Sequence, residues 1–356
     1  MNVTFKDVAK LANVSTQTVS RVTNGSPNVA EETREKVNAA IKELGYVPNK
    51  GAQLLGSAKS KLIGLVTVDL LLHGASLVAN GIRKQAKELG YGTSLSAVSE
   101  YAMDKIIDAI NELKAQRVEF IILNLPLSKE DSEMLISQYL GINFVFLDVP
   151  PDAKVNAVYA ANYEGGIQAA ELMISLQKKR FLLITGPHES SASELRLEAW
   201  LDVLNKYPDV EIINQFEGDW QASSGYRLAH EALCDGRSFD CVLVGSDQMA
   251  LGVSRALNEF NLAIPQDVSI IGFDDTVDSA YFYPPLTTIK QDFLAAGQRA
   301  VLLAISMADQ PTCSYRHESI PTLLVKRKST LLCERREDNK PQIRALLKQV
   351  EQLLTK

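Results

Sequence analysis

The chain has 356 residues, of which 46% are hydrophobic, and this length exceeds what a single hydrophobic core usually supports. The net charge of −6 argues against a uniformly basic nucleic-acid binder. Residues 1–60, however, hold eight Lys and Arg against five Asp and Glu, a balance of +3 that leaves −9 for the rest. We therefore expect two or three domains, with a small basic one ahead of a larger acidic body.

No apolar run is as long as a membrane-spanning helix requires, and the first residues carry charges where a signal peptide is hydrophobic. We therefore expect a cytoplasmic protein without a membrane partner. The cysteines form no C-x-x-C pair and have no histidine at metal-ligand spacing. Neither a disulfide, a metal nor another cofactor is expected. The four cysteines are Cys234, Cys241, Cys313 and Cys333.

Residues 1–46 predict three short helices. Thr4 and Asp7 are spaced as an N-cap and its acidic partner at the start of the first helix. The apolar side of this helix would consist of Val8, Ala9 and Leu11, and it would end at Ala12 and Asn13. Ser15 caps a second helix over residues 16–22, and Glu31 to Leu44 form the third, with Gly45 as its stop. Two short helices across a tight turn are a helix-turn-helix.

The second helix places small hydroxyls, an amide and a guanidinium on its exposed face. Such a face suits phosphates and base edges better than packing, although an ordinary helical bundle is the simpler alternative. Gln17 and Arg21 have the groups that read adenine and guanine edges in the major groove. The predicted DNA contacts here are Ser15, Thr16, Gln17, Thr18, Ser20, Arg21 and Asn24.

From Leu62, short apolar runs alternate with amphipathic helices, which predicts two doubly wound α/β lobes. Ligands bind at the carboxyl ends of strands in such sheets, so two facing lobes would form a cleft. Asn124, Asp148, Asp247 and Asp274 each follow a predicted strand and suit the hydroxyls of a sugar, with Arg196 as a forked donor and Trp220 as a stacking surface. Any single aspartate could equally be a helix N-cap.

The end of the chain has the spacing of a coiled-coil seam after a polar linker at residues 334–341. We expect residues 342–356 to form a helix that joins subunits, whereas packing on the chain's own body is the alternative. The seam would consist of Ile343, Leu346, Leu347, Val350, Leu353 and Leu354.

The run F-K-D-V-A-K-L-A-N-V-S-T-Q-T-V-S-R-V-T-N resembles the N-terminal signature of the LacI/GalR family of repressors. The resemblance implies a helix-turn-helix domain (1–46), a hinge helix (47–59) that enters the minor groove of operator DNA, and a periplasmic-binding-protein-like core (60–333). Gly51 and Gly56 each cost a helix about 1 kcal/mol relative to alanine, so the hinge would be marginal alone. The implied DNA contacts in and beside the hinge are Tyr46, Asn49, Ala52, Gln53 and Leu55.

Along nearly the whole chain the sequence is similar to a sugar-responsive member of this family, notably in P-P-L-T-T-I-K-Q-D-F. Lobe 1 is expected at about 60–160 and 290–320, and lobe 2 at about 161–289 and 321–333. The similarity implies that His73 relays the effector state at the lobe interface. It implies an effector pocket formed by Leu72, Gly74, Ala75, Val78, Asn124, Asp148, Arg196, Trp220, Ser246, Asp274, Gln291 and Phe293.

This chain departs from that member at several positions. Thr16 replaces an aromatic recognition residue, and smaller side chains stand at pocket positions Ala160, Ala192, Ser246 and Ala296. We therefore expect an altered operator base and a wider pocket.

The sequence predicts a non-enzymatic, allosteric transcriptional repressor of a sugar-utilisation operon. Its partners would be two-fold symmetric operator DNA, a galactoside-like inducer, and further copies of the chain in a homodimer or homotetramer. Within the family, a different sugar or a purine corepressor is the alternative effector. A sugar transport protein would share the core but need a secretion signal, and a sugar-processing enzyme would need a nucleophile or an acid and base pair. We find no such motif.

Overall fold

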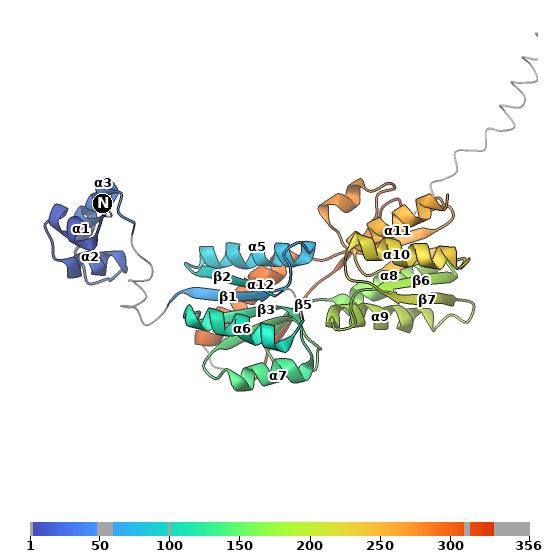
Figure 1. Cartoon of the computed structure of the whole chain (residues 1–356), viewed down its shortest axis with the longest axis horizontal. Coiled ribbons are helices and arrows are strands. Elements are labelled where there is room, and N and C mark those ends of the chain that lie inside the picture. Colours follow the sequence, from blue (N-terminus) through green and yellow to red (C-terminus); the bar gives the residue numbers. More distant parts are fainter. Residues whose placement is uncertain (1–2, 48–59, 99–100, 310–313, 331–356) are drawn as a thin grey trace, which may run out of the picture. The chain divides into compact units, whose positions relative to one another are not determined.

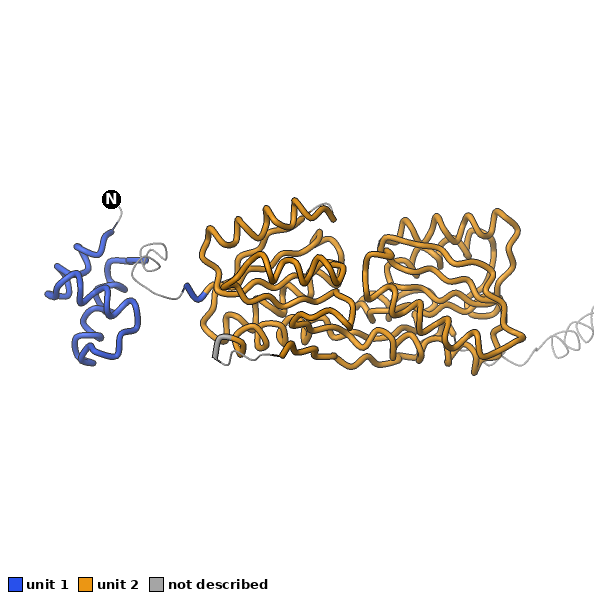
Figure 2. Tube along the Cα trace, turned by 90° about the horizontal axis from the view of Figure 1, so that it is seen from below, with its two compact units in different colours: residues 1–61 blue, residues 62–356 orange. Residues whose placement is uncertain are grey.

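The structure is a computed structural model that describes residues 3–47, 60–98, 101–309 and 314–330. The chain divides into two compact units, residues 1–61 (unit 1) and residues 62–356 (unit 2), as coloured in Figure 2. Several predicted sites fall outside the described residues. These are Asn49, Ala52, Gln53 and Leu55 of the hinge, and the tail seam of Ile343, Leu346, Leu347, Val350, Leu353 and Leu354.

Unit 1 contains helices α1 (Phe5–Leu11), α2 (Thr16–Thr23) and α3 (Glu31–Leu44). Thr4 donates its backbone N–H and its hydroxyl to the Asp7 carboxylate, at 2.8 and 2.7 Å, and so begins α1. The Ser15 hydroxyl accepts the Thr18 N–H at 3.0 Å and begins α2. Gly45 has a φ of +61° after α3, a conformation that favours glycine at a helix end. The predicted starts of all three helices are confirmed.

Val8, Val19 and Val37 are fully buried where the three helices of unit 1 meet. Leu11 is 44% exposed, so its assignment to the core was wrong. It stands where α1 turns away from the core, and the smaller Ala12, 8% exposed, packs there instead. Burying these valines together supplies the main stabilisation of so small a unit.

Lobe 1 of unit 2 is a six-stranded parallel sheet in the order β11-β5-β4-β3-β1-β2. Its strands are β1 (Leu62–Thr67), β2 (Gly92–Ala97), β3 (Phe120–Pro126), β4 (Asn143–Asp148), β5 (Ala157–Ala160) and β11 (His317–Ile320). Helices α5 (His73–Glu88) and α12 (Phe293–Asp309) pack into one core cluster, and α6 (Met103–Ala115) and α7 (Lys129–Gln138) into another. The helices therefore cover both faces of the sheet, as predicted for a doubly wound lobe.

Lobe 2 has the strand order β12-β10-β9-β8-β6-β7, in which only β12 runs antiparallel to its neighbour. Its strands are β6 (Arg180–Thr185), β7 (Glu211–Glu217), β8 (Cys241–Val244), β9 (Ser269–Asp274), β10 (Thr287–Lys290) and β12 (Leu323–Val325). Its helices are α8 (Asn162–Ser175), α9 (Ser191–Leu204), α10 (Ala222–Cys234), α11 (Asp247–Glu259) and the 3-10 helix η1 (Val277–Tyr281). Two clusters of buried side chains again lie on its two faces.

The chain passes between the two lobes three times: from β5 to α8, from β10 to α12, and from β11 to β12. Figure 1 shows these connections as the links between the two parts of unit 2. Side chains from both lobes border one cavity. The carboxyl ends of β1, β3 and β4 therefore face the carboxyl ends of the strands of lobe 2. No helix in the described residues is long and apolar enough to cross a membrane.

Candidate functional site

The side chains at the strand ends of the two lobes border a cavity of about 730 Å³, which lies in the usual range for small-molecule sites. The structure brings to this one cavity every residue of the effector pocket that the family similarity implies: Leu72, Gly74, Ala75, Val78, Asn124, Asp148, Arg196, Trp220, Ser246, Asp274, Gln291 and Phe293. His73 and the small residues Ala160, Ala192 and Ala296 border it as well.

Arg196 is the buried cation of the cavity, with 4% of its surface exposed. Its Nε donates to Asn162 Oδ1 at 3.0 Å, and a terminal nitrogen donates to the Gly245 carbonyl. Its guanidinium lies 3.8 Å from the ring centre of Phe273. Burial lowers the pKa of Arg196 to about 10, so it stays charged at neutral pH and can donate to ligand oxygens.

Asp274 ends β9 with a φ of +124°, which L residues rarely adopt. Its carboxylate accepts the Gln291 side-chain N–H at 2.7 Å, and its carbonyl accepts the Gln291 backbone N–H at 3.2 Å. Burial raises the pKa of Asp274 to about 8, although the nearby Arg196 acts to lower it. A ligand with hydroxyl groups would give this carboxyl group further hydrogen-bond partners.

Asp148 ends β4 in lobe 1, but its hydrogen-bond partners lie at the start of α9 in lobe 2. The Ser190 hydroxyl donates to one carboxylate oxygen at 2.7 Å, and the Ala192 N–H donates to the other at 3.1 Å. Burial raises the pKa of Asp148, while these two hydrogen bonds act to lower it. Asp148 therefore joins the lobes at the cavity.

Two aromatic side chains are set in the cavity wall by close contacts with glycines. The Trp220 ring lies so near Gly186 that a Cβ there would be 2.1 Å from it, and the Phe293 ring would be 2.8 Å from a Cβ at Gly74. Neither glycine could carry a side chain without moving the ring. Trp220, half-buried, offers the apolar face of its ring to the cavity, and Phe293 contributes to the apolar wall on lobe 1.

Two further residues of the predicted effector pocket, Asn124 and Ser246, use some of their hydrogen-bonding groups within the protein. The Asn124 side-chain N–H donates to the Thr67 hydroxyl at 3.2 Å, which leaves the side-chain oxygen Oδ1 without a hydrogen bond from the described residues. The Ser246 hydroxyl caps α11 by accepting the Met249 N–H at 3.2 Å. Both side chains retain hydrogen-bonding capacity toward the cavity.

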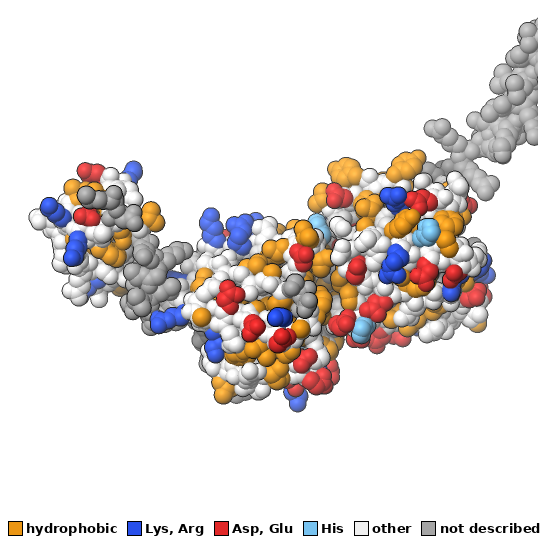
Figure 3. All heavy atoms as spheres, in the orientation of Figure 1, with side chains coloured by type: hydrophobic (Ala, Val, Ile, Leu, Met, Phe, Trp, Pro, Cys, Tyr) orange, Lys and Arg blue, Asp and Glu red, His pale blue; other side chains and the backbone are white. Residues whose placement is uncertain are grey.

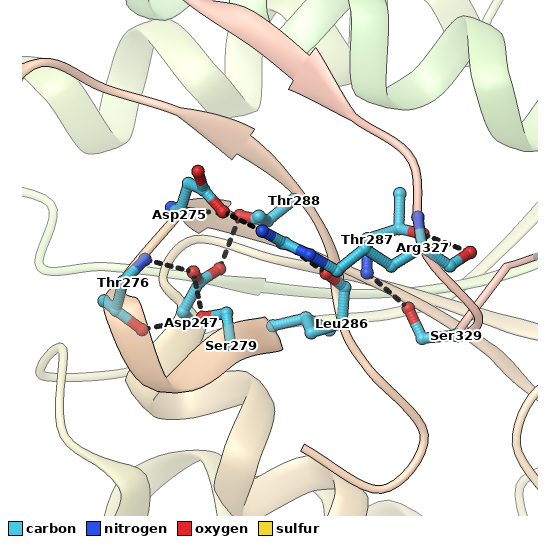
Figure 4. Close-up of polar contacts among 9 residues, drawn as sticks. All are labelled: Asp247, Asp275, Thr276, Ser279, Leu286, Thr287, Thr288, Arg327 and Ser329. Atoms are coloured by element: carbon cyan, nitrogen blue, oxygen red, sulfur yellow. Dashed lines mark hydrogen bonds and ion pairs between the residues drawn. The ribbon is translucent and has the colours of Figure 1, made fainter. Parts of the chain in front are cut away.

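The assignment of Asp247 to the ligand was wrong. Its side chain is fully buried and borders no part of the cavity, because it turns inward from the start of α11. Its carboxylate accepts the Thr276 N–H at 2.9 Å and the hydroxyls of Ser279 and Thr288, each at 2.5 Å (Figure 4). Burial raises the pKa of Asp247 to about 6, against these three hydrogen bonds.

The cavity also includes residues that the sequence analysis missed, among them Tyr101, Asn162 and Gln248. Asn162 follows β5 as the other polar residues follow their strands, so its signal was available once that four-residue strand was recognised. Tyr101 lies in a loop and had no such signal. Although 49% of its surface is exposed, desolvation raises the pKa of Tyr101, with Asp148 and Glu189 adding to the effect.

The predicted DNA-reading face is present on α2 of unit 1. Thr16, Gln17 and Arg21 are exposed, while Val19 and Val22 of the same helix are buried. Ser15 and Asn24 are also exposed, and Thr18 and Ser20 are half-buried. Figure 3 shows Lys and Arg side chains on this unit, and acidic side chains spread over the visible face of unit 2.

Tyr46 differs from the predicted DNA contacts of unit 1. It is 8% exposed, and its ring centre lies 5.4 Å from that of Phe5. Its side chain is therefore part of the unit's core, because the chain leaving α3 folds back over α1.

Comparisons with known proteins match both units. Residues 4–49 fit the family described as bacterial regulatory proteins, lacI family, and residues 170–330 fit the periplasmic binding protein-like domain. The chain is 38% identical over 329 residues to the lactose operon repressor of Escherichia coli (strain K12), covering 92% of this chain and 91% of that protein. It is 30% identical over 331 residues to the ribose operon repressor of the same strain, covering 92% and 99%.

A solved structure of the lac repressor dimer bound to operator and the anti-inducer ONPF matches with a TM-score of 0.88 at 38% identity. The match covers 93% of this chain and 100% of that chain. The predicted helix-turn-helix domain and two-lobed periplasmic-binding-protein-like core are thereby confirmed. These relatives are transcriptional repressors and not enzymes. The chain belongs to the lacI family of bacterial regulatory proteins and is a DNA-binding transcriptional repressor.

Proposed function

We propose that this repressor controls a sugar-utilisation operon and leaves its operator when a galactoside-like sugar occupies the cavity of unit 2. One observation carries the proposal: the effector-pocket residues implied by the family similarity all border one cavity. The cavity combines a buried guanidinium at Arg196, carboxylates at Asp148 and Asp274, and the apolar face of Trp220. That combination suits a polyhydroxylated ring with one apolar face.

The DNA side of the proposal rests on α2. Two copies of unit 1, paired through a dimer, would place α2 in successive major grooves of a two-fold symmetric operator, with Gln17 and Arg21 at base edges. The hinge would contribute Asn49, Ala52, Gln53 and Leu55 in the minor groove, and the tail would join two dimers into a tetramer. The protein would act in the bacterial cytoplasm, at the nucleoid.

The experiment is operator release by a panel of small molecules. An operator selected from random DNA by the full-length protein is titrated with isopropyl β-thiogalactoside, allolactose, cellobiose, ribose and a purine base. We expect release by a galactoside and, by linkage, weaker galactoside binding to the operator complex by the same factor. Absence of any response to galactosides would refute the lac-type assignment.

A different effector is the second candidate, and the small cavity residues favour it. Ala160, Ala192 and Ala296 leave space for a ligand of another shape. Release by cellobiose, ribose or the purine alone, or tighter operator binding with the purine, would select this candidate.

A further inference from the structure

Two consecutive residues at the carboxyl end of β9 have unusual backbone conformations. Asp274 has a φ of +124° and Asp275 a φ of +56°, both in the region that L side chains rarely adopt. Such conformations persist only where the surrounding structure fixes them, and they concentrate at functional sites. Because Asp274 borders the cavity, whatever fixes this turn also determines where its carboxylate lies.

The first group that fixes the turn is Asp247 (Figure 4). Its carboxylate receives the backbone N–H of Thr276, two residues after Asp274, at 2.9 Å. It also receives the hydroxyls of Ser279 in η1 and Thr288 in β10. A Cβ on Gly272 would lie 2.3 Å from Asp247 Oδ1, so the carboxylate sits directly against the backbone of β9.

The second group is Arg327, from the segment that follows β12. One of its terminal nitrogens donates to Asp275 Oδ1 at 2.6 Å, and the other donates to the Leu286 carbonyl at 2.9 Å. This ion pair is largely buried, with 20% and 14% of the two side chains exposed. The Asp275 N–H lies 3.4 Å from the Thr288 hydroxyl oxygen that it faces. Residues 274–276 are thus held in place by side chains of α11, of β10 and of the segment that follows β12.

We propose that Asp247 and Arg327 are positioning residues for the effector cavity, which hold residues 274–276 so that the Asp274 carboxylate stays at the ligand. This rests on the proposed function of the cavity. Neither residue borders the cavity, so neither contacts the ligand.

The placement of Asp247 extends its effect beyond one strand. Its neighbours Ser246 and Gln248 both border the cavity at the start of α11. Through Asp247, the same helix start also fixes Asp274 on β9. A ligand that contacts α11 and β9 therefore meets groups whose relative position is set by one buried carboxylate.

The test compares Asp247→Ala and Asp247→Asn with a matched control, Asp240→Ala, in the full-length protein. Asp240 also binds backbone amides with its carboxylate, those of Lys179 and Arg180 at 3.1 and 3.0 Å. It precedes β8, at the opposite end of the same sheet, and does not border the cavity. Two quantities are measured: amide hydrogen exchange of a peptide spanning residues 274–279, and affinity for o-nitrophenyl β-galactoside, lactose, cellobiose and ribose by calorimetry.

We expect Asp247→Ala to speed exchange of residues 274–279 and to weaken sugar binding, each by about tenfold or more, since three hydrogen bonds are lost. The Asn variant keeps an oxygen for the Thr276 N–H and should restore most of both. Asp240→Ala should change neither by more than about twofold, because its amides lie far from the turn.

Unchanged exchange at residues 274–279 in Asp247→Ala overturns the proposal, as does an equal loss of sugar affinity in Asp247→Ala and the control. If Asp247→Ala does not fold, Arg327→Gln, which removes the ion pair with Asp275, is compared with Asp240→Ala by the same criterion. A wild-type protein that binds none of the sugars refutes the proposed function instead, and the exchange measurement still decides whether Asp247 holds the turn.

Discussion

The Ser190 hydroxyl of lobe 2 donates a 2.7 Å hydrogen bond to the carboxylate of Asp148 in lobe 1, at the border of the cavity. The Ala192 N–H binds the other oxygen of the same carboxylate. Both contacts sit at the start of α9, where the helix dipole also favours a negative charge. The two lobes are therefore linked through the Asp148 carboxyl group next to the proposed ligand.

Ser190→Ala should weaken sugar binding by about tenfold or more, because a hydrogen bond to a charged group contributes about 1.5–3 kcal/mol. Loss of this bond should also raise the pKa of Asp148 further, since the bond acts to lower it. Calorimetry with the best sugar of the panel measures the effect. Ser132→Ala is the control, because Ser132 is buried in lobe 1 and bonds only the Lys129 carbonyl of its own helix. Equal affinities in the two variants would contradict the prediction.

Asp274→Asn should stabilise the folded protein relative to the wild type, and this advantage should grow as the pH rises. The folded-state pKa of Asp274, about 8, lies above its ordinary value of 3.8, so the folded protein binds more protons between those two pH values. Its contribution is favourable at low pH and is lost as pH rises from about 4 to 8. The asparagine removes this loss. Melting temperatures at pH 5 and pH 8 should therefore show an advantage of the variant that grows by roughly 3 °C or more. The exposed Asp278→Asn serves as control, and a difference that does not grow with pH would contradict the argument.

Gln17→Ala and Arg21→Ala should each reduce operator affinity, because a bidentate base contact contributes about 1–3 kcal/mol of discrimination. Binding to random DNA should change less, since it depends mainly on phosphate contacts. Fluorescence anisotropy with selected and scrambled operators at fixed salt measures both. Asn38→Ala, on the exposed side of α3, is the comparison. If both substitutions lower specific and random binding equally, these residues do not read bases.

Deleting residues 340–356 should convert tetramers into dimers in sedimentation equilibrium. The reason is the predicted seam of Ile343, Leu347, Val350 and Leu354, which has coiled-coil spacing. DNA affinity for a single operator should be unchanged, whereas looping between two operators should be lost. A mass unaffected by the deletion would place subunit contacts elsewhere. Tyr281 and Tyr283, which are 81% and 96% exposed, would then be the next residues to replace.

The sequence predicted the helices of unit 1 well because each end carries its own signal: Ser15 before α2 and Gly45 after α3. The alternation of strands and helices in unit 2 could be predicted for the same reason, because most of its elements are recognised from their own residues. The strands β5 and β12, of four and three residues, were missed, since a period of two is hard to recognise over so few positions. Leu11 was misassigned because a helix terminus can turn away from the core that its spacing indicates.

Asp247 and Asp274 illustrate how far the site can be predicted from the sequence. Both follow a buried strand, yet one turns into the protein and the other borders the cavity. The direction is decided by partners distant in the sequence, Ser279 and Thr288 for the first and Gln291 for the second. Local sequence patterns do not contain that information.

The three passages of the chain between the lobes have a consequence during synthesis. The sheet of lobe 1 is complete only when β11 has been made, and that of lobe 2 only when β12 has been made. Because chains emerge from the ribosome amino end first, unit 1 can fold early, while both lobes must wait until almost the entire chain is available. A nascent repressor thus acquires its helix-turn-helix well before the cavity between its lobes. A chain that stops before β11 would leave the apolar edge of β5 open to aggregation.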